Sequence, residues 1–212
     1  CSKHSNGRLG FFTPKFPNYT FRIFTTMNMY KTIKNKNVIL SDKFLKMIDT
    51  EDYYIFLESE NFEIFLSYDN RQLENDHAFI QWIFPTIRAS QFNYRCPILD
   101  IKELRCHDNF EFAKEKMLQS LNLMKNHWGI RTNSENKDEI YDIRKFRMLN
   151  GHNGLRLSRV LQSLVYHDLH DEAQKLLDFI LDNIKHLTPC FQNGKTIWEL
   201  RFDEAVDEVS NI

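Results

Sequence analysis

The chain has 212 residues, of which 28 are Lys or Arg and 29 are Asp or Glu, so its formal net charge at pH 7 is -1. This balance excludes a strong overall attraction to nucleic acid or to a membrane surface. No apolar run approaches the roughly 18 to 20 residues that a membrane-spanning helix needs. The chain also does not begin with an apolar leader and cleavage site, so we expect an intracellular protein of the nucleus or cytoplasm.

Charge is distributed unevenly along the chain. Residues 1–48 carry nine basic side chains and one acidic side chain, a local charge of +8, whereas residues 49–76 carry nine acids and one arginine, a local charge of -8. The two segments can attract each other, or the basic segment can serve an anionic partner. The four cysteines show no CxxC spacing, which favours reduced thiols.

The first 40 residues predict a basic, aromatic arm that is irregular or partly β. Its glycines and prolines are followed by a β-branched and aromatic stretch, and its rings alternate with Lys and Arg. Basic groups with stackable rings are typical of single-strand nucleic-acid binding. The alternative, which we favour, is an arm that packs its rings on the rest of the protein and leaves its lysines in water.

From residue 41 onward the patterns are helical, and we expect one domain over 41–212. Ser41 and Asp42 are suitable caps for a short helix that ends at Met47. Residues 52–66 contain enough aromatic side chains to form one helix buried on one side, or to break into two helices.

The stretch LENDHAFIQWIFP, residues 73–85, predicts a helix that is apolar on nearly every side and ends at Pro85. At 3.6 residues per turn, the exceptions Glu74, His77 and Gln81 share one stripe. That stripe is either the one solvent-exposed side of a buried helix or a polar face that lines a groove.

The second half of the chain gives clearer helical spacing. Residues 108–128 have apolar side chains three or four apart, and Gly129 follows as a C-terminal cap. Residues 132–139 predict a polar loop. A helix then resumes at Ile140 and ends before Gly151.

The last segments predict a helical hairpin and one further helix. Apolar faces at 157–165 and 173–184 indicate two antiparallel helices, which are joined by about five residues. A turn is expected at QNG, residues 192–194, and a final helix over 195–209. The predicted fold is therefore mostly α, a single non-repetitive helical domain with an irregular or partly β N-terminal arm.

Two motifs resemble one known family. HAFIQWIFP at 77–85 is similar to a block in which a His precedes an aromatic residue and IQWLFP, and HNGLRLSRVLQSL at 152–164 is similar to a later block of the same family. This family is the opioid growth factor receptor (OGFr) conserved region. The resemblance covers about residues 69–184 and is weaker over 41–68. It implies a helical, non-enzymatic domain of intracellular, often nuclear-associated proteins. Peptide-hormone binding is not carried over with the fold.

The candidate partner- or ligand-binding residues are His77, Gln81, Trp82, His152, Arg156 and Arg159. The structural alternative for His77 and Gln81 is that they hydrogen-bond Glu74 or a nearby loop, since unpaired buried polar groups are costly. Trp82 is expected in the core, where its indole N–H needs an acceptor. We favour the structural interpretation, in which the stripe of Glu74, His77 and Gln81 is a polar seam that holds neighbouring loops.

The basic side chains of the second half are candidates for anion binding: Arg144, Lys145, Arg147, Arg156 and Arg159. In that hypothesis guanidinium groups bind phosphate or carboxylate, and the HNG sequence at 152–154, which is expected to precede the helix, adds backbone N–H donors at its N-terminus. The alternative, which we favour, is a solvated face or salt bridges to the acidic segments.

Catalysis has the least support. His167-Asp168 and His170-Asp171 repeat an HD pair, but the four residues end one helix and enter a turn. The sequence contains no GxSxG, P-loop, GxGxxG or HExxH motif. We expect no metal or cofactor.

The leading hypothesis is a non-enzymatic protein or peptide interaction module in an intracellular assembly. The alternative is a nucleic-acid or other anion-binding protein that uses the basic arm and the arginine-rich helix face.

Overall fold

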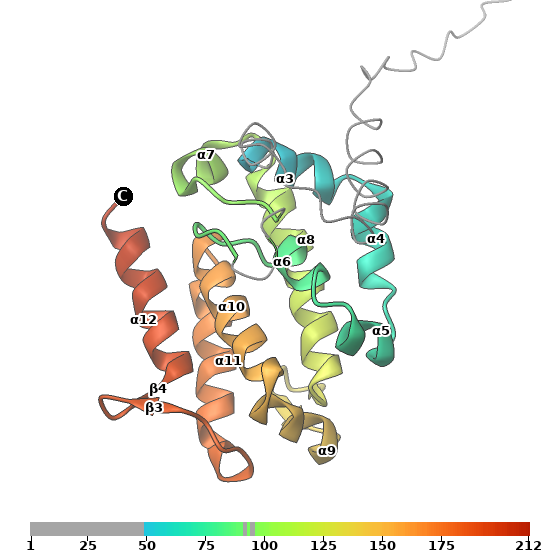
Figure 1. Cartoon of the computed structure of the whole chain (residues 1–212), viewed down its shortest axis with the longest axis vertical. Coiled ribbons are helices and arrows are strands. Elements are labelled where there is room, and N and C mark those ends of the chain that lie inside the picture. Colours follow the sequence, from blue (N-terminus) through green and yellow to red (C-terminus); the bar gives the residue numbers. More distant parts are fainter. Residues whose placement is uncertain (1–48, 91–92, 94–95) are drawn as a thin grey trace, which may run out of the picture. The chain divides into compact units, whose positions relative to one another are not determined.

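The described part of the chain is mostly α-helical, as predicted. The computed structural model describes residues 49–90, 93 and 96–212, and these belong to one compact unit. Helices dominate, and the sheets in the described ranges are two antiparallel hairpins (Figure 1). No helix in these ranges combines the length and apolar character that crossing a bilayer requires. The predicted arm over 1–40 and the predicted helix at 41–47 lie outside the described residues.

The aromatic segment after residue 48 breaks into two helices, one of the two predicted outcomes. Helix α3 spans Thr50–Leu57 and is capped by Asp49, whose side chain accepts a hydrogen bond from Asp52 N. Helix α4 spans Glu60–Leu66. Each helix contributes buried aromatic side chains to the core, including Tyr53, Phe56, Phe62 and Phe65.

The predicted single helix over 73–85 is wrong. Helix α5 spans Asn70–Asn75, with an Asp69/Gln72 capping box, and a separate helix α6 spans Phe79–Ile83. Asp76 ends α5 in extended backbone geometry, and its carboxylate accepts a hydrogen bond of 2.7 Å from Ala78 N. A side chain that bonds the backbone two residues ahead competes with helix continuation. Glu74, His77 and Gln81 therefore do not share one helical stripe.

The middle of the chain contains a long helix and a small hairpin. Helix α7 spans Ile101–Cys106, and helix α8 spans Phe110–His127. Gly129 follows α8 with φ +72°, as expected of a C-terminal cap, and an added Cβ would lie 2.3 Å from the Asp142 carbonyl oxygen.

Strands β1 (Ile130–Thr132) and β2 (Asp138–Ile140) pair in antiparallel fashion. The predicted polar loop over 132–139 is confirmed for 133–137, which connect the strands, and its two ends belong to the strands. Helix α9, Ile143–Phe146, begins later than the predicted Ile140, because Ile140 pairs with Ile130 in this hairpin. The 3-10 helix η1 follows at Arg147–Asn150.

The predicted helical hairpin is confirmed. Helix α10 spans His152–Tyr166 and helix α11 spans His170–Asp182, and residues 167–169 connect them. Helix α10 packs against α11 on one side and α12 on another (Figure 1). Much of the core comes from its buried apolar side chains Leu157, Val160, Leu161, Leu164 and Val165.

The chain ends in a β-hairpin and a helix. After the 3-10 helix η2, Ile184–His186, strands β3 (Phe191–Gln192) and β4 (Lys195–Thr196) form the hairpin. The predicted turn is confirmed: Asn193 and Gly194 have φ 52° and 80°, which suits a two-residue type I′ turn. Helix α12 spans Ile197–Ser210 and begins with a Thr196/Glu199 capping box, close to the predicted bounds.

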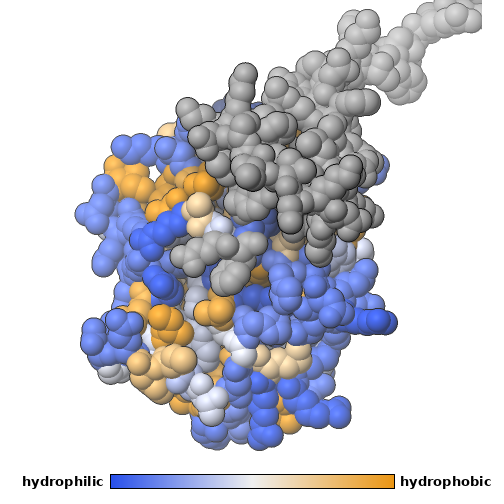
Figure 2. Space-filling model, in the orientation of Figure 1, coloured by the Kyte–Doolittle hydropathy of each residue, from blue (hydrophilic) through white to orange (hydrophobic). Residues whose placement is uncertain are grey.

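Where Figure 2 colours the described residues, most of the side chains on this face are polar, and the apolar side chains lie in separate patches.

Candidate functional site

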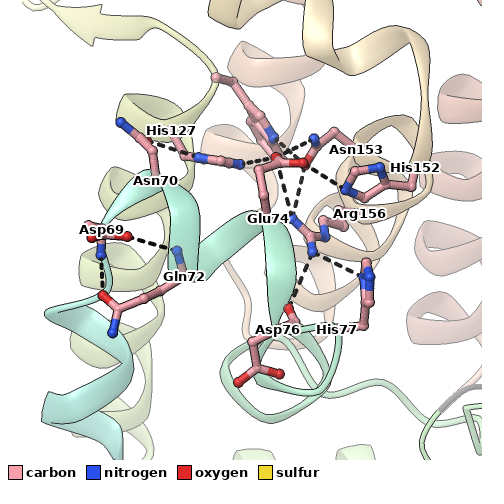
Figure 3. Close-up of polar contacts among 11 residues, drawn as sticks. Asp69, Asn70, Gln72, Glu74, Asp76, His77, His127, His152, Asn153 and Arg156 are labelled. Atoms are coloured by element: carbon pink, nitrogen blue, oxygen red, sulfur yellow. Dashed lines mark hydrogen bonds and ion pairs between the residues drawn. The ribbon is translucent and has the colours of Figure 1, made fainter.

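The two sequence motifs meet in one polar cluster. Its members come from α5, from the turn that follows α5, from the C-terminal end of α8 and from the first turns of α10 (Figure 3). We call this group the Glu74 cluster; it consists of Glu74, His77, His127, His152, Asn153 and Arg156.

The Glu74 carboxylate is the centre of the cluster. Its Oε1 atom lies 2.8 Å from His127 Nε2 and accepts a hydrogen bond of 2.9 Å from Asn153 Nδ2. Its Oε2 atom lies 3.1 Å from His152 Nε2. His127 is also 3.1 Å from the Asn70 side chain through Nδ1, which ties α8 to the start of α5. One carboxylate thus joins three helices.

Arg156 connects the same cluster to the turn after α5. This arginine is only 5% exposed. Its guanidinium donates to Asn153 Oδ1 at 3.2 Å and to the Asp76 carbonyl oxygen at 3.3 Å, and it lies 3.9 Å from Glu74. It also lies over the Phe79 ring, 5.3 Å from the centroid. The predicted salt bridge between an Arg of this helix and the acidic segment is confirmed at Arg156, whereas a solvated position is wrong for this residue.

The N-terminus of α10 is a further feature that favours a carboxylate at this position. Residues 152–154, which we predicted to precede the helix, form its first turn instead. Gly151 is the N-cap and has no side chain to accept from the free N–H groups. The helix dipole favours a negative charge at this end. Glu74, which comes from a helix distant in the sequence, supplies that charge, so it occupies the region where we had hypothesised an external anion.

Asn153 links the cluster to the core. Its Oδ1 atom accepts from the buried Trp128 indole at 3.3 Å, in addition to the bond from Arg156. Gly154 follows, and its carbonyl oxygen accepts from the Trp198 indole of α12 at 2.9 Å. Both indole N–H groups therefore have partners, as buried polar groups require.

The charges in the cluster shift the pKa values of its members. Burial by itself raises the pKa of Glu74, but hydrogen bonds from Asn153 and His127 and the charges of His127 and His152 outweigh it, so the pKa lies below its usual value. Burial lowers the pKa of His127, and the bond to Glu74 offsets only part of that effect. We therefore expect a charged Glu74 at neutral pH.

The surface of the cluster is formed by two histidines. His77 is exposed, and its ring meets the His152 ring edge-on at a centroid distance of 5.6 Å. The His152 side chain is 47% exposed. Leu155, one turn farther along α10, is 62% exposed. His77 contacts His152, and Leu155 is a neighbour of His152 because residues three apart on a helix lie side by side. The three side chains therefore share one surface.

Gln81 and Trp82 lie apart from that surface. Gln81 is buried in α6, and its Oε1 atom has no hydrogen-bond partner within the described ranges. Trp82 is half-buried and packs against the core, with its ring 5.0 Å from that of Phe56. The predicted seam of Glu74, His77 and Gln81 is thus confirmed only for Glu74 and His77, which lie in the same cluster.

The other candidate basic residues are dispersed. Arg159 turns into the protein, where Nε donates to the Phe84 carbonyl oxygen at 2.7 Å. Lys145 donates to the Tyr141 hydroxyl at 3.1 Å. The Arg144 side chain is 91% exposed, and Arg147 is also exposed. The structure therefore does not gather the basic side chains of 144–147 and the two arginines of α10 into one exposed site.

The two HD pairs also separate. His167 is completely buried, with Nε2 3.0 Å from the Tyr53 hydroxyl and Nδ1 2.7 Å from the Ser163 carbonyl oxygen. His170 is exposed on α11 and packs beside the Phe202 ring. The described residues contain no group of three or more His, Cys, Asp or Glu side chains that could hold a metal ion.

The sequence analysis did not select two members of the Glu74 cluster, His127 and Asn153, or the Asn153 partner Trp128, as candidate site residues. His127 and Trp128 lie at the C-terminal end of α8 and are fully enclosed. A polar residue at the end of an amphipathic helix is ordinary in a sequence, so nothing local marked His127. The only signal for Asn153 was its place between His152 and Gly154 in the second motif.

Comparison with known proteins identifies relatives of this chain. Residues 44–191 match the family model described as "Opioid growth factor receptor (OGFr) conserved region". The chain is 29% identical over 130 residues to the opioid growth factor receptor of Mus musculus, an alignment that covers 58% of this chain and 20% of that protein. It is 30% identical over 117 residues to the Homo sapiens protein of the same name, covering 52% and 17%. No solved structure shows significant similarity.

The chain spans about a fifth of the length of these curated relatives. Both relatives are named as receptors and not as enzymes. The matched region includes the whole Glu74 cluster.

Proposed function

Because the chain belongs to the opioid growth factor receptor conserved-region family, we propose that its helical domain is a non-enzymatic module that binds a protein or peptide partner. The similar proteins are named receptors, which supports a binding role. The proposed setting is an intracellular assembly in the nucleus or cytoplasm, and the proposed ligand class is a polypeptide.

The observation that carries this proposal is the convergence of both motifs on the Glu74 cluster. The cluster fixes the turn after α5 against α10 through hydrogen bonds from Arg156 to Asp76 and His77. The surface it holds in place presents His77, His152 and Leu155. A pre-organised surface loses less conformational entropy on binding. We name these three side chains the motif surface.

We assign partner contact to the motif surface and not to the other candidate residues. Gln81 is buried and Trp82 packs against the core. Arg156 and Arg159 donate to backbone carbonyl oxygens within the protein. An exposed leucine beside two imidazoles suits a polypeptide partner that contributes an apolar side chain and polar groups at its rim.

Among the residues that the structure describes, the nucleic-acid alternative lacks a comparable site. It needs clustered, accessible cations that contact phosphates. Of the candidates, Arg144 and Arg147 are exposed, while the α10 arginines are directed inward. A salt series separates the two proposals, because phosphate contacts make affinity fall steeply with salt concentration.

The test places a photo-crosslinking amino acid at Leu155 in the tagged full chain expressed in its native cells. The matched control places it at Lys175, an exposed residue of α11. We expect one polypeptide to be crosslinked from position 155 and not from position 175, in nuclease-treated and untreated samples alike. Leu155→Asp, without the crosslinker, should prevent recovery of the same polypeptide. Loss of the crosslink after nuclease treatment, or equal crosslinking from both positions, would overturn the proposal.

The opioid growth factor in the relatives' name is the first ligand to titrate against the purified chain. Saturable binding that Leu155→Asp weakens would define the ligand of the motif surface. Binding that is unchanged in Leu155→Asp would assign the peptide to another surface.

A further inference from the structure

Tyr141 differs from the other described tyrosines in its exposure. The described tyrosines are Tyr53, Tyr54, Tyr68, Tyr141 and Tyr166. Tyr141 is 38% exposed, whereas the other four are buried or half-buried. An enzyme that modifies a tyrosine needs access to its hydroxyl group. Tyr141 is therefore the most accessible candidate for modification in the described ranges.

The hydroxyl groups of two other tyrosines face carboxylates. Tyr68 donates to Asp76 at 3.1 Å, and Tyr166 donates to Glu208. A phosphate on either tyrosine would be placed against a like charge. These two positions therefore disfavour phosphorylation.

Tyr141 has two cations around it instead. Lys145 Nζ donates to the Tyr141 hydroxyl oxygen at 3.1 Å and lies 5.4 Å from the ring centroid. The guanidinium carbon of Arg131 is 6.0 Å from the same centroid, and this arginine also pairs with Glu139 at 2.6 Å. A phosphotyrosine carries a charge of about -1.5 to -2 at pH 7. That charge would be added beside an ammonium group that already contacts the oxygen to be modified.

The hydroxyl proton of Tyr141 contacts the C-terminal end of α8. It is donated to the Asn126 carbonyl oxygen at 2.9 Å. Phosphorylation replaces this proton, so the bond is lost, and the negative end of the helix dipole repels the new charge. The next acid along the chain, Asp142, is engaged as the cap of α9, where it accepts from Arg144 N and Lys145 N. A phosphate would therefore be drawn from α8 towards Lys145.

The residues before Tyr141 present it at the end of an extended segment. Strand β2 ends at Ile140, the residue before Tyr141. The Glu139 side chain, two residues before Tyr141, is 40% exposed. Kinases select substrates in part through the charge pattern around the hydroxyl group. An accessible acid at this position suits a tyrosine kinase with a basic substrate site.

We propose that Tyr141 is a phosphorylation site and that Lys145 is the counter-ion of its phosphate. A tyrosine kinase transfers the γ-phosphoryl group of ATP to Tyr141 Oη. The bond between this phosphorus and the β–γ bridging oxygen breaks, ADP leaves, and the hydroxyl proton passes to the catalytic aspartate of the kinase. The inference does not use the motif surface and shares with the proposed function only the intracellular setting, where ATP is present.

The test incubates the purified full chain with ATP, Mg²⁺ and the catalytic domain of a tyrosine kinase that prefers acidic residues before the tyrosine. Mass spectrometry then maps the modified residues. We expect phosphate on Tyr141 and none on the other four described tyrosines. Tyr141→Phe, which keeps the ring, should lose this modification. The same phosphopeptide is expected from the tagged full chain recovered from its native cells with a tyrosine-phosphatase inhibitor.

The role of Lys145 is measured as the rate at which a tyrosine phosphatase removes the phosphate from the modified chain. The phosphate must leave the ammonium group to enter the phosphatase site. Lys145→Gln should therefore speed its removal about threefold, the effect of losing one exposed charge pair. Lys175→Gln on α11 is the control and should keep the wild-type rate. A phosphopeptide of residues 136–146 should be dephosphorylated at one rate with and without Lys145→Gln.

The proposal is overturned if the kinase modifies an unphosphorylated peptide of residues 136–146 but leaves Tyr141 of the folded chain unmodified. Absence of the modification from the chain recovered from native cells overturns it as well. Equal phosphatase rates for the wild type and Lys145→Gln would refute Lys145 as the counter-ion. If Tyr141→Phe fails to fold, the sites mapped on the wild-type chain decide.

Discussion

Glu74 Oε2 lies 3.1 Å from His152 Nε2, so the carboxylate of α5 lies beside the first residue of α10. The two residues belong to segments that are far apart in the sequence, and each carries part of the polar cluster. This pair places the negative charge where the N-terminus of α10 favours it. Four predictions on stability follow from the cluster and the packing around it.

Glu74→Ala is expected to destabilise the chain by about 2 to 3 kcal/mol, because Arg156 and His127 lose their carboxylate partner while they remain buried. The measurement is the free energy of unfolding from urea titration at pH 7. Glu115→Ala on the exposed face of α8 is the control, with an expected effect within about 0.5 kcal/mol. Equal effects for both variants would show that the cluster does not stabilise the fold.

Arg156→Lys is expected to destabilise the chain by about 2 kcal/mol, because a lysine cannot reproduce the several guanidinium donors that reach Asn153 and Asp76. The same substitution at Arg144, which is exposed, should change the free energy of unfolding by less than about 0.5 kcal/mol. An unchanged stability of Arg156→Lys would favour a ligand-binding role over a structural role for this arginine.

His167 should make stability depend on pH. Burial lowers the pKa of His167 to about 4, although the bond to the Ser163 carbonyl opposes this shift, while an unfolded histidine titrates near 6.5. Between these values the unfolded chain binds more protons, so the contribution of His167 is complete above about pH 6.5 and is lost as the pH falls towards 4. The loss is on the order of 3 kcal/mol.

The measurement is urea unfolding at several pH values from 7 to 4 for the wild type and His167→Asn. The variant should be less stable at pH 7 but lose less stability on acidification. His170→Asn should keep the wild-type profile. A profile of His167→Asn that runs parallel to the wild type would contradict the assignment.

Gly154→Ala is expected to destabilise the chain by about 2 kcal/mol. An added Cβ would lie 2.8 Å from the Leu149 carbonyl oxygen and 3.6 Å from the Trp198 ring, so the close packing of α10 would have to shift. At Gly151 the nearest atom, the Met148 carbonyl oxygen, is 3.9 Å away. Gly151→Ala meets no such clash, and its cost should stay at about 1 kcal/mol or below, the difference between glycine and alanine as N-caps. Thermal unfolding of both variants tests the difference, and a costlier Gly151→Ala would refute it.

Local patterns predicted the longer helices well. The apolar spacing over 108–128 corresponds to α8, and the two apolar faces after residue 156 correspond to α10 and α11. These helices form where each turn repeats the same buried face, so a short stretch of sequence contains the signal. The Asn193-Gly194 turn was predictable for the same reason, since its geometry depends on the residues in the turn.

The stretch over 73–85 shows where such patterns fail. Apolar residues on all sides predict burial, but they do not show where a helix ends. The end was decided by the Asp76 side chain, which bonds Ala78 N. A single aspartate such as Asp76 is weak evidence for the end of a helix, and the apolar residues that follow it favoured a continuous helix. As a result Gln81 was wrongly grouped with Glu74 and His77.

The sequence by itself determined the helical class of the described domain, most of its longer helices and the two motifs that carry the candidate residues, because these depend on neighbours within a few turns of chain. Only the tertiary structure decided that Glu74, His127 and Arg156 share one cluster. Such contacts depend on which helices pack together and in which register, and no periodicity within one segment contains that information. The environment then decided the role of each side chain: Arg156 is an internal donor because it is enclosed, whereas Arg144 remains in water.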